Sequence, residues 1–278
     1  MTTFNVQMMQ ITRNVYLDLL KFMAIFVMVL DHIGHFLLPD DLFTTTVIRG
    51  IGRFAMPLFF ITHGYLLSQR PHPPSLKRIA KLLMYGSFLS VGLYAITNEF
   101  TFNILFQFAL VEIFWLRYIG EMTIKEHLLD GFAKKNTIQS MLETALILLL
   151  VDQVISLEQI IDYGVYPLFY AVAGLMFGYA HHYSEQRMEK VAFVVLITTL
   201  SFEYNPFLVL LYSIFVDNSM LYFALPSLII PILVWYIPKA NIELTTLRLP
   251  IALVSRNALN IYVVHLLAII AIRLALPL

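Results

Sequence analysis

Apolar stretches of about 20 residues recur along this chain with short polar segments between them. A helix needs about 20 residues to cross the roughly 30 Å hydrocarbon core of a bilayer. Hydrophobic residues make up 59% of the 278 positions and charged residues 13%, against about 25% charged in a soluble domain. The sequence therefore predicts an all-α, polytopic transmembrane helical bundle, as one domain over residues 1–278, with about nine spans (eight to ten) at 16–38, 46–69, 79–97, 102–120, 138–156, 165–181, 191–216, 220–236 and 250–276.

Composition and missing motifs exclude several function classes. The chain has no cysteine, which excludes disulfides, thiolate metal sites and a cysteine nucleophile. Its formal net charge is zero and it has no basic block, so nucleic acid is not an expected partner. No HExxH, GxSxG, Walker or GxGxxG pattern occurs, so neither a metal nor a nucleotide site is predicted. The first run is too long for a signal peptide and lacks a small-residue cleavage site, so we interpret it as a retained span.

The distribution of basic residues predicts the topology. With a cytoplasmic amino terminus and a single crossing at 191–216, almost all Lys and Arg residues face the cytoplasm, leaving Arg49, Arg53 and Arg273 outside. That run contains Asn205 and Pro206 near its middle, so we favour one broken crossing over two membrane segments. Two segments, which would move the last basic loop outward, remain the alternative.

Charged residues interrupt the first two runs, although each costs roughly 2.5–3.5 kcal/mol at the centre of a span. Lys21 and His32 are eleven residues apart, so they share a helix face about 16 Å apart, with Lys21 inward. Arg53 in the antiparallel second run lies at the depth of His32. Asp31 precedes His32 directly and faces elsewhere, so it is expected to pair with Arg49 or Arg53. These four outward residues form a predicted outer layer, which we define as Asp31, His32, Arg49 and Arg53.

A second predicted layer lies toward the cytoplasm and contains Asp18, Lys21 and His63, with Asp18 able to pair with Lys21. His265 lies near mid-membrane in the last run, and Asp162 opens another span on the outer side. Imidazole titrates near neutral pH, so a histidine beside Asp and Arg suits proton transfer. The structural alternative is that the ion pairs fix helix packing and that His63 and His265 are hydrogen-bonded core histidines.

Five blocks of this sequence resemble the TraX family, whose named member acetylates the amino terminus of conjugative pilin. They are LDLLKFMAIFVMVLDHIGHFLL (17–38), IRGIGRFAMPLFFITHGYLL (48–67), NILFQFAL (103–110), DYGVYPLFY (162–170) and NIYVVHLL (260–267). The family in turn resembles transmembrane acyltransferases such as the bacterial O-antigen acetylases, in which an Arg, ten residues and a His occupy the first span. Here Lys21 stands for that Arg, and His63 stands where Ser is usual.

The resemblance implies a bacterial inner-membrane acetyltransferase. It would move an acetyl group from cytoplasmic acetyl-CoA to a pilin, a fimbrial protein or another surface polymer. His32 would be the base or transient acyl carrier, with Asp31 and Arg53 also catalytic, and with Lys21, His63 and Arg49 contacting the donor. Asp18, Asp162 and His265 are further candidates, and no metal is implied. Two alternatives stay open: a non-enzymatic pilus assembly protein, and a proton-coupled transporter with Asp31, His32 and His265 as its relay.

Overall fold

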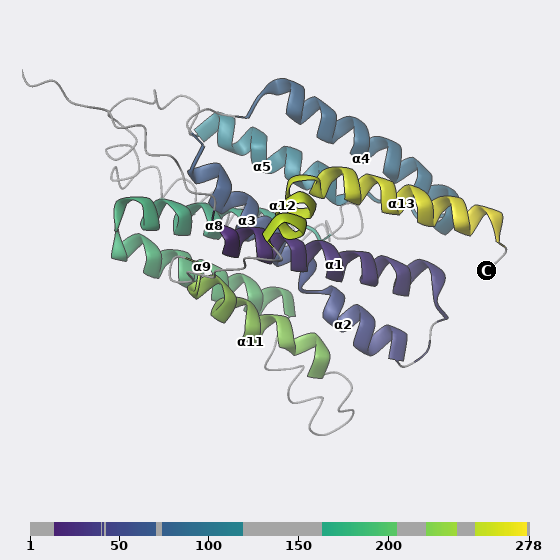
Figure 1. Cartoon of the computed structure of the whole chain (residues 1–278), viewed down its shortest axis with the longest axis horizontal. Helices are drawn as coiled ribbons and strands as arrows, with labels where there is room; N and C mark the ends of the chain where they lie inside the picture. Colours follow the sequence, from purple (N-terminus) through teal and green to yellow (C-terminus); the bar gives the residue numbers. More distant parts are fainter. Residues whose placement is uncertain are drawn as a thin grey trace, which may run out of the picture.

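The structure, a computed structural model, describes residues 14–39, 41, 43–70, 74–118, 163–204, 221–237 and 248–276. Within these ranges the elements are all helical, which confirms the predicted all-α class there. They are α1 (Val15–Leu37), the π-helix η1 (Phe43–Ile48), α2 (Arg49–Gly52), α3 (Ala55–Ser68), α4 (Leu76–Thr97), α5 (Ile104–Tyr118), α8 (Tyr166–Tyr183), α9 (Gln186–Tyr204), α11 (Leu221–Trp235), α12 (Arg248–Arg256) and α13 (Ala258–Ala275) (Figure 1).

Two of these helices, α4 and α13, are long and apolar enough to cross a membrane by length and composition. Shorter apolar helical stretches cover Ile104–Leu116 and Leu225–Trp235. The predicted span at 138–156 lies outside the described residues. So does the second half of the run at 191–216, and the choice between one and two segments there stays a prediction. The single-domain assignment also stays a prediction.

Helix α1 packs against α3, α12 and α13. Asn14 caps its start, because its side-chain oxygen accepts hydrogen bonds from the backbone N–H groups of Tyr16 and Leu17 at 2.9 and 3.3 Å. The Tyr16 hydroxyl donates to the Leu233 carbonyl at 2.9 Å, which joins the start of α1 to α11. The helix ends at Leu38, in an extended conformation before Pro39, as expected for a residue that precedes proline.

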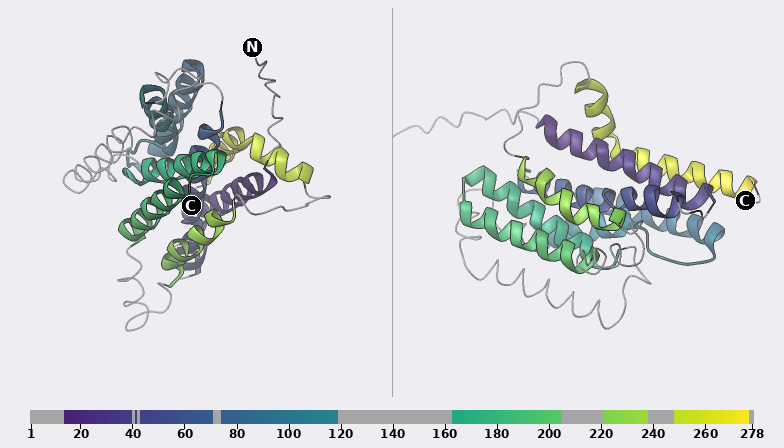
Figure 2. Two further views of the ribbon diagram at one scale, coloured as in Figure 1. Left: turned by 90° about the vertical axis from the view of Figure 1, so that its left-hand side faces the viewer. Right: turned by 90° about the horizontal axis from the view of Figure 1, so that it is seen from below.

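The second and last apolar runs are each broken, although hydropathy predicted one helix for each. Run 46–69 becomes part of η1, then α2 and α3, with a turn at Arg53 and Phe54. Pro57 lies in the first turn of α3, where its missing N–H breaks no helical hydrogen bond. Run 250–276 divides at Asn257 into α12 and α13, and α12 projects at an angle from α13 (Figure 2, right).

Among the described helices, α3 and α8 pack in close contact, because glycines let their backbones touch. A Cβ at Gly64 would overlap the Ala171 carbonyl, and a Cβ at Gly174 would overlap the Ile61 carbonyl. Small residues permit this approach between helices in membranes. The contact fixes the start of α3, which follows Arg53, against the start of α8, which follows Tyr163.

Candidate functional site

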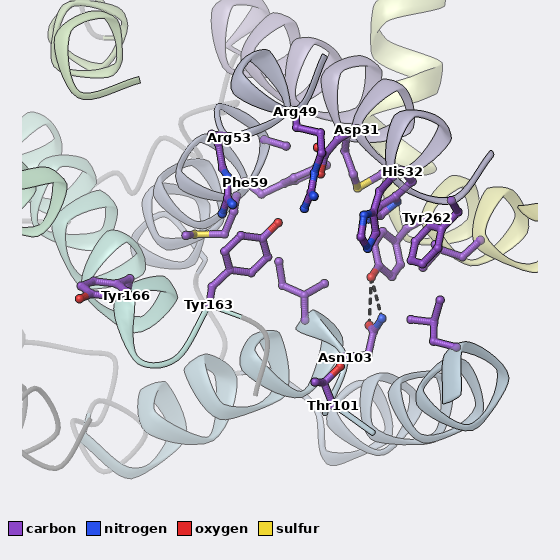
Figure 3. A pocket seen from close by; sticks show the side chains of 18 of the residues that line it. Asp31, His32, Arg49, Arg53, Phe59, Thr101, Asn103, Tyr163, Tyr166 and Tyr262 are labelled. Carbon is purple, nitrogen blue, oxygen red and sulfur yellow. Dashed lines mark hydrogen bonds between the residues drawn. The ribbon is translucent and has the colours of Figure 1, made fainter. Parts of the chain in front are cut away.

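A cavity of about 750 Å³ opens between several helices, among them α1, α9 and α13 (Figure 3). All four residues of the predicted outer layer, Asp31, His32, Arg49 and Arg53, line it. Helix α1 supplies the aspartate and the histidine, α2 begins with Arg49, and Arg53 follows α2 directly. The structure therefore brings the predicted outer layer together, while the catalytic roles expected for it stay predictions.

The Asp31 carboxylate packs against α2, because a Cβ at Gly52 would overlap its side chain. Asp31 is attracted electrostatically by Arg49 and Arg53. Across the described ranges, however, no ion pair joins Asp31 to either guanidinium. The expected Asp31–Arg53 pair is thus a longer-range attraction. Arg49 Nε is buried without a hydrogen-bond partner, so this guanidinium retains an unused donor beside the cavity.

His265, from the last helix, lies against His32. His32 Nδ1 is 2.7 Å from His265 Nε2, and the two rings are stacked with centroids 5.0 Å apart and planes at 11°. His265 Nδ1 is 2.8 Å from the carbonyl oxygen of Ile261, one turn earlier in α13. Tyr262 lies edge-on to His32, with ring centroids 6.1 Å apart. The sequence left the partner of His32 unidentified, and in the structure its Nδ1 contacts His265.

The opposite wall is aromatic and acidic, and sequence reasoning missed its residues. Tyr163 points toward the arginines from the segment before α8 (Figure 3), and Tyr166, Glu203 and Tyr204 line the same side. The Tyr204 hydroxyl donates to the Arg53 carbonyl at 2.9 Å. Glu203 accepts a hydrogen bond from the Tyr170 hydroxyl. The block at 162–170 signalled this wall, although Asp162 itself lies outside the described residues.

Asn103 and Tyr262 close the cavity beside His32. The Asn103 amide donates to the Tyr262 hydroxyl at 2.8 Å, and that hydroxyl is 3.1 Å from the amide oxygen (Figure 3). The Asn103 backbone N–H donates to Ser90 Oγ at 2.9 Å. This network fixes the ring that contacts both histidines. Asn103 and Tyr262 both lie in blocks that resemble the TraX family, which is the signal that sequence reasoning left unused.

The predicted inner layer forms a separate cluster. His63 Nε2 lies 3.5 Å from Glu112 Oε1, and that same oxygen accepts from Arg78 Nε at 2.5 Å. Lys21 and Arg70 are close enough to His63 to repel its positive form. None of these five residues lines the outer cavity. Glu112 is completely buried, and the sequence analysis did not single it out.

Asp18, the remaining inner-layer residue, accepts a hydrogen bond from Ser255 Oγ at 2.6 Å. The bond joins the first turn of α1 to the end of α12. Within the described ranges, no group of three or more His, Cys, Asp or Glu residues could hold a metal ion.

Comparisons with known proteins give one family. A family model described as TraX protein matches residues 16–273. A Rickettsia prowazekii (strain Madrid E) protein described as uncharacterized protein RP591 is 36% identical over 91 residues, which are 32% of this chain and 32% of that protein. The match thus covers about a third of that relative's length. No solved structure matches the chain.

Proposed function

Because the chain belongs to the TraX family, as its sequence blocks predicted, we propose that it is a membrane-embedded acetyltransferase. Its donor would be cytoplasmic acetyl-CoA, and its acceptor an amine or hydroxyl of a pilin, a fimbrial protein or another surface polymer. The proposal includes a multi-pass topology in the bacterial inner membrane, with a cytoplasmic amino terminus. Support for this topology comes from the two membrane-length helices and from the basic residues expected inside.

One observation carries the proposed chemistry: His32 shares a cavity with two guanidinium groups. Acyl transfer needs a base that removes a proton from the acceptor and a donor of hydrogen bonds to the oxyanion that forms on the acyl carbon. His32 provides the first, and Arg53 with the unused Arg49 Nε provides the second. His32 then returns its proton to the departing thiolate, so that the base is regenerated.

The donor is proposed to bind from the cytoplasmic side. Lys21 carries a positive charge there, and Arg70 and Arg78 lie near buried His63, so the inner cluster has several groups that attract phosphate. Arg49 lines the outer cavity, whereas Lys21, Arg70 and Arg78 do not. We therefore propose that Arg49, among the residues expected to contact the donor, contacts its acetyl group.

A proton-coupled transporter is the second candidate, and the contact between His32 and His265 favours it. Two imidazoles joined at 2.7 Å can pass a proton between helices. Such a transporter would move solute into vesicles in response to a proton gradient, without acetyl-CoA. The third alternative, a non-enzymatic assembly protein, predicts that pili form normally when His32 is changed.

The test uses the full-length protein in lipid nanodiscs with acetyl-CoA and purified candidate acceptors. We expect wild-type protein to add the mass of one acetyl group to its acceptor. Replacing the general base, by His32→Ala, should lower the rate by about 10²–10⁴-fold. His182→Ala, at an exposed position at the end of α8, is the matched control and should keep the wild-type rate. Equal rates for His32→Ala and wild type would refute the proposed function.

A further inference from the structure

We propose that His265 is a positioning residue, which holds His32 in the tautomer that carries its proton on Nδ1 and leaves Nε2 unprotonated as the base. The catalytic consequence rests on the proposed function, but the tautomer itself does not. The argument begins at the Ile261 carbonyl, an acceptor that carries no proton. Since His265 Nδ1 is 2.8 Å from this oxygen, that nitrogen must be the donor.

The proton on His265 Nδ1 determines the next bond. A neutral imidazole has one N–H, so His265 Nε2 is then an acceptor. His32 Nδ1 lies 2.7 Å away and must therefore donate to it. The alternative is a cationic His265 that donates from both nitrogens. No ion pair with a carboxylate supports such a cation at His265 within the described residues, and an unpaired charge between packed helices is costly.

His32 Nε2 is left without a proton and forms no hydrogen bond with the part of the chain that the structure describes. This is the state that a general base needs. The His32 ring lies nearly parallel to the His265 ring, with 11° between the planes, and Tyr262 lies edge-on to it. In serine proteases a carboxylate performs this orienting role, and its loss places the histidine proton on the wrong nitrogen and costs about 10⁴-fold in kcat. Here a neutral histidine performs it, from a residue 233 positions away in the sequence.

Two substitutions separate hydrogen bonding from packing. His265→Phe keeps a flat ring against His32 but removes the acceptor. His265→Gln restores an acceptor oxygen near the position of Nε2 and cannot become charged. The His182→Ala variant again serves as the control.

The first readout is the ¹⁵N and ¹³C NMR spectrum of histidine-labelled protein in nanodiscs, with the His32 signals assigned by their loss in His32→Ala. We expect the Nδ1–H tautomer at His32 in wild type and His265→Gln, and the Nε2–H tautomer in His265→Phe. An Nε2–H tautomer at His32 in wild type would overturn the proposal. This spectrum needs no enzymatic activity, so its result is independent of the proposed function.

The second readout is the acetyl-transfer rate. His265→Phe should lower kcat by about 10²-fold or more with little change in KM, and His265→Gln should recover most of the loss. If His265→Phe keeps the wild-type kcat in an active enzyme, the positioning role is wrong while the acetyltransferase stands. If wild type transfers no acetyl group to any acceptor but shows the Nδ1–H tautomer, the acetyltransferase fails and the positioning of His32 stands.

Discussion

Gly174→Ala tests whether the backbone contact between α3 and α8 sets the site. The added Cβ would overlap the carbonyl group and Cα of Ile61, which are main-chain atoms of α3 and cannot rotate away. The helices would have to separate. Gly92→Ala in α4 is the matched control, because its Cβ meets only Ile270 Cδ1, at 2.9 Å, the end of a flexible side chain. Both substitutions replace a helical glycine with alanine.

The expected energies follow from two opposing terms. Alanine is favoured over glycine in a helix interior by about 1 kcal/mol. Overpacking a tight interface costs about 1–3 kcal/mol, and contact with backbone places Gly174→Ala toward the upper end. The net expectation is a loss of about 1–2 kcal/mol for Gly174→Ala and a gain of up to about 1 kcal/mol for Gly92→Ala.

Reversible unfolding in mixed micelles, followed by circular dichroism as the denaturing detergent fraction rises, measures both variants. Gly174→Ala should also slow acetyl transfer more than Gly92→Ala, because α3 and α8 both contribute residues that line the cavity, such as Phe59 and Tyr166. The reasoning is refuted if the two variants have the same stability, including the case in which both are destabilised equally, since the backbone contact would then explain nothing.

Two further substitutions test the two polar layers. Arg53→Gln removes a guanidinium from the outer cavity, so kcat should fall by about 10²–10³-fold. Initial rates at saturating acetyl-CoA measure this loss. An unchanged rate would exclude Arg53 from oxyanion stabilisation. Glu112→Gln leaves Arg78 without its buried anionic partner, but the Arg78 side chain is 43% exposed and can turn toward solvent. We therefore expect a loss of about 1–2 kcal/mol, less than for a fully buried pair, and detergent unfolding that matches wild type would contradict it.

The outer layer could be predicted because its geometry is mostly local. Helical periodicity fixes where Asp31 and His32 lie along α1, and a count from Pro57 fixes the depth of Arg53. Composition and run length predicted the helical class for a similar reason. The break at Arg53 and Phe54 was missed because the run 46–69 is apolar over most of its length, although Pro57 in a first helical turn was a usable signal.

The partners of buried polar groups could not be predicted, because they depend on how distant helices pack. His265 was placed near mid-membrane, but its contact with His32 requires α13 to lie along α1. Glu112 and Arg78 are 34 residues apart on neighbouring helices, and nothing local joins them. Ser255 at the end of α12 likewise donates a hydrogen bond to Asp18, a contact across 237 positions.

An aromatic layer separates the two polar layers and constrains the proposed reaction. Phe60 stacks on Phe108 with centroids 4.2 Å apart, and His63 lies edge-on to the same ring at 5.1 Å. Phe59, which lines the outer cavity, also contacts Phe108 edge-on. Arg53 precedes α3 and His63 lies in its third turn, with Phe59 and Phe60 between them in the sequence. In the proposed reaction, a donor held by Lys21 and His63 would carry its acetyl group past Phe108 to reach His32.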